Sequence, residues 1–162
     1  MAINVRKGSA HSLTQTDFVG TIKSGEGVDA GHLVMKNSNG EIVKAPTNWS
    51  ANDGLIGFAI TSQAEGDAIA SGKIGVYALD GGSVIETSYF VGSVTSAMIG
   101  DYVVPDSDAA GHTGTAGYVK VVQSRTDAAA INLIIGKVYD APRTIYVGQS
   151  SVTVLPIKLA AN

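Results

Sequence analysis

Few side chains in this sequence are of the kinds that do acid, base or metal chemistry. The histidines are His11, His32 and His112, and no two have the His-x-x-x-His spacing that brings a pair of ligands to one metal ion. Counting does not exclude a Ser-His-Asp triad, because its members meet in space rather than in sequence. The chain has no Gly-x-Ser-x-Gly elbow, however. Because His32 and His112 each follow a glycine, we expect ordinary turn residues there.

Two further patterns resemble binding sites only formally. Asp101, Asp106 and Asp108 are the densest carboxylate group, but the glycine and glutamate that complete an EF-hand calcium loop are missing, which favours a solvated turn. Residues 25–30 fit Gly-x-Gly-x-x-Ala, a dinucleotide fingerprint that requires a helix to begin there. The chain also lacks cysteine, which removes thiol catalysis and Cys-ligated zinc. We expect no catalytic residue, no metal site and no cofactor.

The stretch 25–45 predicts a β-hairpin instead of a nucleotide site. Its two apolar runs, 32–35 and 41–45, flank a turn that ends in Asn39-Gly40. Asn-Gly between β-prone runs is a strong hairpin signal, because both residues tolerate positive φ. The glycines before this hairpin therefore serve turns.

The second half of the chain repeats the order of the first. Residues 99–104 follow the pattern of 30–35, residues 117–121 parallel 41–45, and residues 133–138 parallel the Ile-Gly strand at 55–59. Two copies of one β unit predict a pseudo-symmetric barrel or sandwich in which neither half need be stable alone. Chance similarity between hairpins is the alternative.

Composition agrees with a β-rich fold. Charged residues make up only 15% of the 162 residues, against roughly 25% in average domains, and 20 residues are glycine. No window has helical periodicity over three turns. We therefore predict a mostly β chain, a small antiparallel β-barrel or sandwich of β-clip-like type, with little helix. The net charge of -3 makes nucleic acid and anionic membranes poor partners, and no apolar run is long enough to span a bilayer.

The predicted organisation is an extended N-terminal arm over 1–17 and one β-rich domain over 18–162. Within that domain, the pseudo-repeats cover about 18–91 and 92–141, and C-terminal strands cover 142–162. The arm is too polar to fold alone. It is either a frayed terminus or a segment that adds a strand to a neighbouring sheet edge.

Apolar residues near the C-terminus and the single tryptophan are candidate interface residues. Pro156 cannot donate to a ladder, so the tail is expected at an edge or a bulge, where an apolar strand needs cover. Trp49 is either a lid on the core or an exposed anchor. The interface candidates are Trp49, Leu155, Ile157 and Leu159.

The pattern of residues 25–77 resembles that of one protein family. It comprises Gly-Val-x-Ala-Gly-x-Leu-Val at 27–34, Ile-Val-Lys-Ala at 42–45, Leu-Ile-Gly-Phe-Ala at 55–59 and Glu-Gly-Asp-Ala-Ile at 65–69. This arrangement resembles the small capsid decoration, or cement, proteins of tailed bacteriophages. The familiar short members are smaller than this chain, and the repeated unit departs from their pattern.

The resemblance implies a non-enzymatic, often trimeric protein on the outside of the capsid, assembled in the host cytoplasm. Its partners would be the major capsid protein and further copies of itself, with no nucleic acid and no membrane. We expect the arm to contact the capsid by backbone pairing and to order only on binding. The candidate capsid contacts are Ile3, Val5, Arg6 and Lys7.

Three other classes suit the same composition. The first is another virion part, such as a β-module associated with a tail or fibre. The second is a peptidase-like domain, since clip-like β folds also occur in peptidases. The third is a sugar-binding module, for which the nominated aromatic residues are Trp49, Tyr77, Tyr89 and Tyr118.

Overall fold

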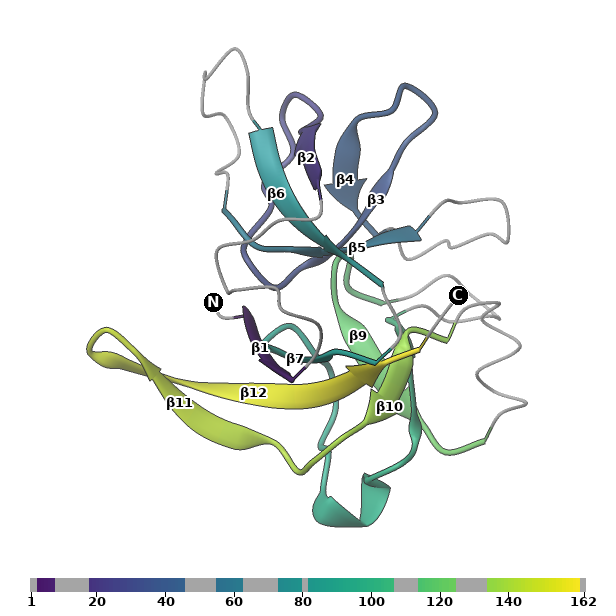
Figure 1. The fold of residues 1–162 in the computed structure, drawn as a ribbon, viewed down its shortest axis with the longest axis vertical. Coiled ribbons are helices and arrows are strands. Elements are labelled where there is room, and N and C mark those ends of the chain that lie inside the picture. The colour runs from purple at the N-terminus through teal and green to yellow at the C-terminus, as the bar shows by residue number, and fades with distance from the viewer. Residues whose placement is uncertain are drawn as a thin grey trace.

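The protein is mostly β, and its strands form two antiparallel sheets (Figure 1). The computed structural model describes residues 3–7, 18–45, 55–62, 73–79, 82–106, 114–124 and 134–160. The one helical element in these ranges is a short 3-10 turn, η1 (Ser96–Met98). The predicted fold class is therefore confirmed as mostly β with two antiparallel sheets.

The first sheet, at the top of Figure 1, has five strands in the order β2-β6-β5-β3-β4. Its strands are β2 (Phe18–Thr21), β3 (Leu33–Lys36), β4 (Ile42–Lys44), β5 (Leu55–Ala59) and β6 (Lys73–Ala78).

The second sheet has seven strands, six of them in the order β1-β7-β12-β10-β8-β9, while β11 pairs with β12 alone. Its strands are β1 (Ile3–Lys7), β7 (Val84–Thr87), β8 (Tyr102–Pro105), β9 (Val119–Val122), β10 (Gly136–Val138), β11 (Arg143–Val147) and β12 (Ser150–Leu159).

The hairpin predicted at 25–45 is confirmed as β3 and β4. Asn37 shapes its turn, because its side-chain oxygen accepts hydrogen bonds from the backbone N–H groups of Asn39 and Glu41, both at 2.9 Å. Gly40 follows with φ +77°, in the left-handed region that glycine tolerates. Local side-chain bonding thus explains why an Asn-rich stretch turns here.

The two sheets share one connectivity. Each strand of the first sheet has a counterpart at the same place in the second sheet. The pairs of counterparts are β2 and β7, β3 and β8, β4 and β9, β5 and β10, and β6 and β12. A parallel bridge joins the ends of each path, Ile22 to Ile42 in the first and Phe90 to Val119 in the second. The chain is therefore built from two units of the same topology.

Matching backbone hydrogen bonds place the two units in residue-by-residue correspondence. Gly31 N–H donates to the carbonyl of Ala59 at 2.7 Å, and Gly100 N–H donates to the carbonyl of Val138 at 2.9 Å. Both glycines have positive φ, +102° and +93°. Each one ends the turn before the first central strand of its unit, so the glycine is needed for the same backbone reason in both.

A second glycine pair allows two strands to approach closely in each unit. A Cβ at Gly57 would lie 1.9 Å from the backbone oxygen of Tyr77, and one at Gly136 would lie 2.2 Å from that of Lys158. Any larger residue would push apart β5 and β6, or β10 and β12.

The unit boundary differs from the one that the sequence pattern predicts. The pattern places the second copy from about residue 92, but β7 pairs with β12 in the second sheet, so this unit already begins at Val84. In addition, β12 is not a separate C-terminal strand. It takes the place that β6 has in the first unit.

One apolar core runs between the units, and a smaller one fills the first unit. The first unit contributes Leu33, Phe58 and Tyr77 to the shared core. The second unit contributes Ile85, Val103, Val119, Ile135, Val138, Leu155, Ile157 and Leu159. The smaller core consists of Val28, Val34, Ile42, Ala59, Ile74 and Val76. Because the larger core needs both units, the two form a single folded body.

This core corrects the interface prediction for the tail. Leu155 and Ile157 have no exposed surface and Leu159 has 3%, so they pack inside their own chain instead of presenting a contact surface. The reason is that the second half of β12 lies between β7 and β10 and not at an edge.

Pro156 is accommodated by an irregularity beside β12. Val138 pairs with Ile157 and Arg143 pairs with Val154, so four residues, 139–142, lie opposite only two. The carbonyl of Pro156 accepts from Tyr139 on this side. Because the N and C=O of a strand residue point the same way, the missing N–H faces the irregular segment and leaves the pairing with β7 intact.

We predict that Gly57→Ala destabilises the protein far more than Gly40→Ala. The first substitution forces a methyl group against the Tyr77 backbone and is expected to cost at least about 3 kcal/mol. The second meets open space, and only its positive φ costs about 1 kcal/mol. Urea unfolding of both variants measures the difference, and equal losses would contradict the close approach.

Candidate functional site

A polar and aromatic cluster lies where the two units meet. His32 opens β3, and its Nδ1 accepts a hydrogen bond of 2.9 Å from the backbone N–H of Asp29. Tyr89, which follows β7, donates its hydroxyl to Oδ2 of Asp29 at 2.9 Å. These contacts tie the turn before β3 to the second unit.

Three rings pack together in this cluster. The ring centroids of His32 and Tyr89 lie 3.9 Å apart, and Tyr118 meets Tyr89 edge-on at 5.2 Å. A Cβ at Gly117 would lie 3.1 Å from the His32 ring. The absence of a side chain at residue 117 therefore leaves the space that the imidazole occupies.

Backbone hydrogen bonds reinforce the same place. The carbonyl of Gly117 accepts from Leu33 N–H at 2.7 Å, and Gly117 N–H donates to the carbonyl of Ala45 at 2.9 Å. The hydroxyl of Thr87 donates to the carbonyl of Gly31 at 2.8 Å. We call this set of contacts the sheet junction.

The electrostatics of the sheet junction favour uncharged rings. Burial lowers the pKa of His32 to about 4, although the Asp29 carboxylate acts in the opposite direction. Burial and the hydrogen bond to Asp29 raise the pKa of Tyr89. Since Nδ1 of His32 is an acceptor, the proton of the neutral ring is assigned to Nε2. An imidazole of such low basicity is a poor general base at neutral pH, and the contacts indicate a structural role.

The sequence did not reveal this cluster. It placed His32 in a turn, and it nominated Tyr89 and Tyr118 only as sugar-stacking candidates. The repeat alignment held a usable signal, because Gly31-His32 corresponds to Gly100-Asp101, so that an imidazole replaces a carboxylate at one of two equivalent positions.

The predicted carboxylate group is divided by the fold. Asp106 is buried, and its Oδ2 accepts a 2.7 Å hydrogen bond from the backbone N–H of Thr115, which closes the loop between β8 and β9. Asp101 immediately precedes β8, while Asp108 lies outside the described residues. Within the ranges that the structure describes, no three His, Cys, Asp or Glu residues gather in a way that would hold a metal ion.

A bidentate ion pair fixes the base of a projecting element. Glu86 in β7 is fully buried, and its two carboxylate oxygens accept from Nε and Nη2 of Arg143, each at 2.8 Å. Arg143 is the first residue of β11. A buried carboxylate needs such a partner, so the pair holds the start of β11 against the sheet.

Beyond Arg143, β11 and the first half of β12 leave the body as a two-stranded ribbon, the yellow-green element in Figure 1. We call residues 143–154 the β11–β12 ribbon. Tyr146 is 79% exposed and Val147 is 45% exposed. Among the described strands, none pairs with the outer side of β11. A lone two-stranded ribbon is only marginally stable in water, so this one is a candidate interaction element.

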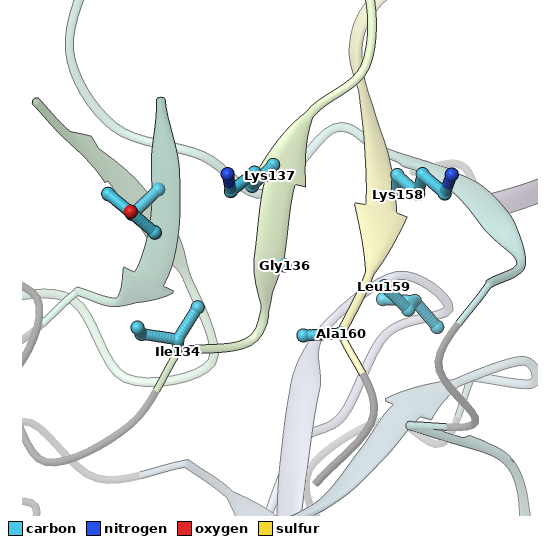
Figure 2. Close-up of a pocket in the computed structure, with 7 residues that line it drawn as sticks. Ile134, Gly136, Lys137, Lys158, Leu159 and Ala160 are labelled. Atoms are coloured by element: carbon cyan, nitrogen blue, oxygen red, sulfur yellow. The ribbon is translucent and has the colours of Figure 1, made fainter. Parts of the chain in front are cut away.

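A cavity of about 450 Å³ opens on the second sheet. Figure 2 shows Ile134 and Ala160 on the two sides of the start of β10, Gly136 and Lys137 on β10, and Lys158 on the neighbouring β12. The ammonium group of Lys137 lies 5.0 Å from the ring centroid of Tyr102, which also lines the cavity. The floor is thus apolar and the rim basic.

The arm residues form part of the chain's own sheet. Ile3, Val5 and Lys7 pair with Thr87, Ile85 and Val84 of β7, and Arg6 lies at an irregularity in the register. The segment 3–7 is therefore already a strand in the chain by itself, in contrast to the expected ordering on binding. Trp49 and the remainder of the predicted arm lie outside the described residues.

Comparison with protein-family models, curated proteins and solved structures found no match for this chain. In the described ranges, no helix has the length and apolar character needed to cross a membrane.

The low basicity of His32 predicts a loss of stability in acid. The folded chain binds fewer protons than the unfolded chain between pH 6.5 and 4, so stability is complete above the unfolded pKa and falls as the pH drops through the folded pKa. We expect His32 to account for a loss of about 3 kcal/mol over this window. Urea unfolding at several pH values, compared with His32→Gln, isolates this loss because His11 and His112 remain in both proteins. Identical pH profiles would contradict it.

The ion pair at the ribbon base yields a second stability prediction. Arg143→Met leaves the Glu86 carboxylate buried without this partner and is expected to lower the urea midpoint. The double variant Glu86→Leu/Arg143→Met removes both charges and is expected to recover part of the loss. A double variant less stable than Arg143→Met would show that the pair is not coupled as the geometry indicates.

Proposed function

We propose that this chain is a structural protein of a bacteriophage virion, a decoration protein that binds the capsid exterior and bridges major capsid subunits. The observation that supports this best is that two elements suited to contact a partner belong to the second sheet. Strand β1 forms one edge of this sheet, and the β11–β12 ribbon projects from it. The polar groups of the sheet junction form hydrogen bonds with one another, and the buried Glu86 is paired with Arg143. Such a chain offers surfaces for association, and we propose no enzymatic activity.

The repeated unit suits a bridging role. A capsid presents many copies of one subunit in a regular lattice, and a chain with two units of like topology can meet two neighbouring copies with related surfaces. The shared core holds these units in one body, so force applied to one is transmitted to the other. A net charge of -3 on 162 residues opposes dense packing only weakly.

Strand β1 supports a specific mode of attachment. It covers the β7 edge and itself forms the next edge of the sheet in the described chain. Backbone N–H and C=O groups on such an edge can pair with a strand of a partner, which is β-augmentation. We propose that a strand of the major capsid protein extends the second sheet beside Ile3, Val5, Arg6 and Lys7.

Deletion of residues 2–16 tests this mode of attachment. We expect the shortened chain to lose most of its binding to purified DNA-filled heads, measured as the protein that sediments with the particles over a range of concentrations. Ile99→Ser is the control, because it removes an exposed apolar side chain beside η1 and leaves β1 in place. A melting curve of each variant shows whether the body is still folded.

Unchanged occupancy of the heads by a folded shortened chain would contradict attachment through β1. Sedimentation of the full chain with isolated tails instead of heads would overturn the decoration role itself and favour a tail or fibre module.

A further inference from the structure

The β11–β12 ribbon and the cavity of the second sheet are complementary surfaces on one chain. Near the end of the ribbon, one residue pair before its turn, Tyr146 has 79% exposure. The cavity, at about 450 Å³, falls within the range that accommodates compact organic groups, and its floor over Gly136 is apolar. We infer that Tyr146 of one copy of this chain inserts into the cavity of a second copy.

The two surfaces of one copy cannot reach each other. Tyr146 pairs with Ser151, and the cavity wall includes Lys158, seven residues further along the same strand β12. At about 3.3 Å per strand residue, the ribbon lies roughly 23 Å from the cavity of its own chain. Figure 1 shows β12 running without interruption from the ribbon into the sheet, so the tip cannot fold back. Only another molecule can bring the surfaces together.

The charges of the cavity favour an aromatic occupant. Lys137 and Lys158 are directly opposed in the register of β10 and β12, an arrangement that like charges disfavour. Figure 2 shows their side chains diverging to the two sides of the cavity. Lys137 already lies over the Tyr102 ring at 5.0 Å. A second ring offers its negative face to these ammonium groups and its hydroxyl as an acceptor.

The geometry of this contact makes the assembly directional. The ribbon and the cavity are different surfaces, so each copy donates one and receives the other, and the contact is head-to-tail. Such contacts close into a ring or continue as a filament. The contact is also small, because the whole ribbon has only five residue pairs, against roughly 20–30 residues a side in a standard interface. We therefore expect self-association to depend on concentration.

Sedimentation velocity of the purified chain, with two variants, tests the inference. Tyr146→Ser removes the inserted ring, and Ala160→Phe fills the cavity. Each alone is expected to raise the concentration needed for association at least tenfold, about the effect of losing an interface hot spot. Val19→Ser is the control, because it removes a side chain with 56% exposure from β2 and is expected to change nothing.

A mixture of the two variants decides the direction of the contact. Ala160→Phe retains a working ribbon and Tyr146→Ser a working cavity, so the mixture is expected to form pairs and nothing larger. A mixture that stays monomeric, or one that assembles to the size of the original protein, would overturn the inference. It would also fail if Tyr146→Ser alone had no effect, or if the original chain stayed monomeric up to about 1 mM. None of these results depends on the capsid role.

Discussion

The fold depends on the backbone contacts of Gly117 at the sheet junction. This residue, which comes just before β9, accepts from Leu33 and donates to Ala45, so it lies beside β3 and β4 of the other unit. Its φ is +82°, and a Cβ at this position would lie 3.1 Å from the ring of His32, so a side chain here would strain the backbone and displace the ring. The orientation of one unit on the other, and hence the shared core, follows from this contact.

Local signals explain what the sequence predicted well. Asn37 fixes a turn through its side-chain hydrogen bonds and Gly40 through its positive φ, and the glycine pairs 31/100 and 57/136 recur because each unit needs the same turn and the same close approach. The predicted alignment of 117–121 with 41–45 is displaced by one residue, since the structure matches Ile42 with Val119. An alignment of two hairpin strands can be displaced by one residue without losing its apolar matches, because apolar residues lie on both sides of the aligned position.

The errors have a common physical origin in contacts between distant segments. The run at residues 154–159 resembles an edge strand because it contains Pro156, and only the irregular segment 139–142, together with β7, makes it central. The sheet junction joins Asp29, Tyr89 and Tyr118 from three separate stretches, which no spacing rule brings together. Periodicity shows that 143–147 is a strand but does not show that Tyr146 is exposed, since exposure depends on what lies above the strand.

The two units have diverged in what they do. The first unit places His32 against the second unit. The equivalent residue of the second unit is Asp101, beside η1, and in the described structure no further unit packs on it. The described residues thus form two units of this topology. In the second sheet, β1 lies at one edge and β11 lies in the connection from β10 to β12, so this sheet carries both the shared core and the projecting ribbon. The glycine turns and close approaches common to both units maintain the fold, while the edge strand β1 and the projecting β11–β12 ribbon belong to the second sheet.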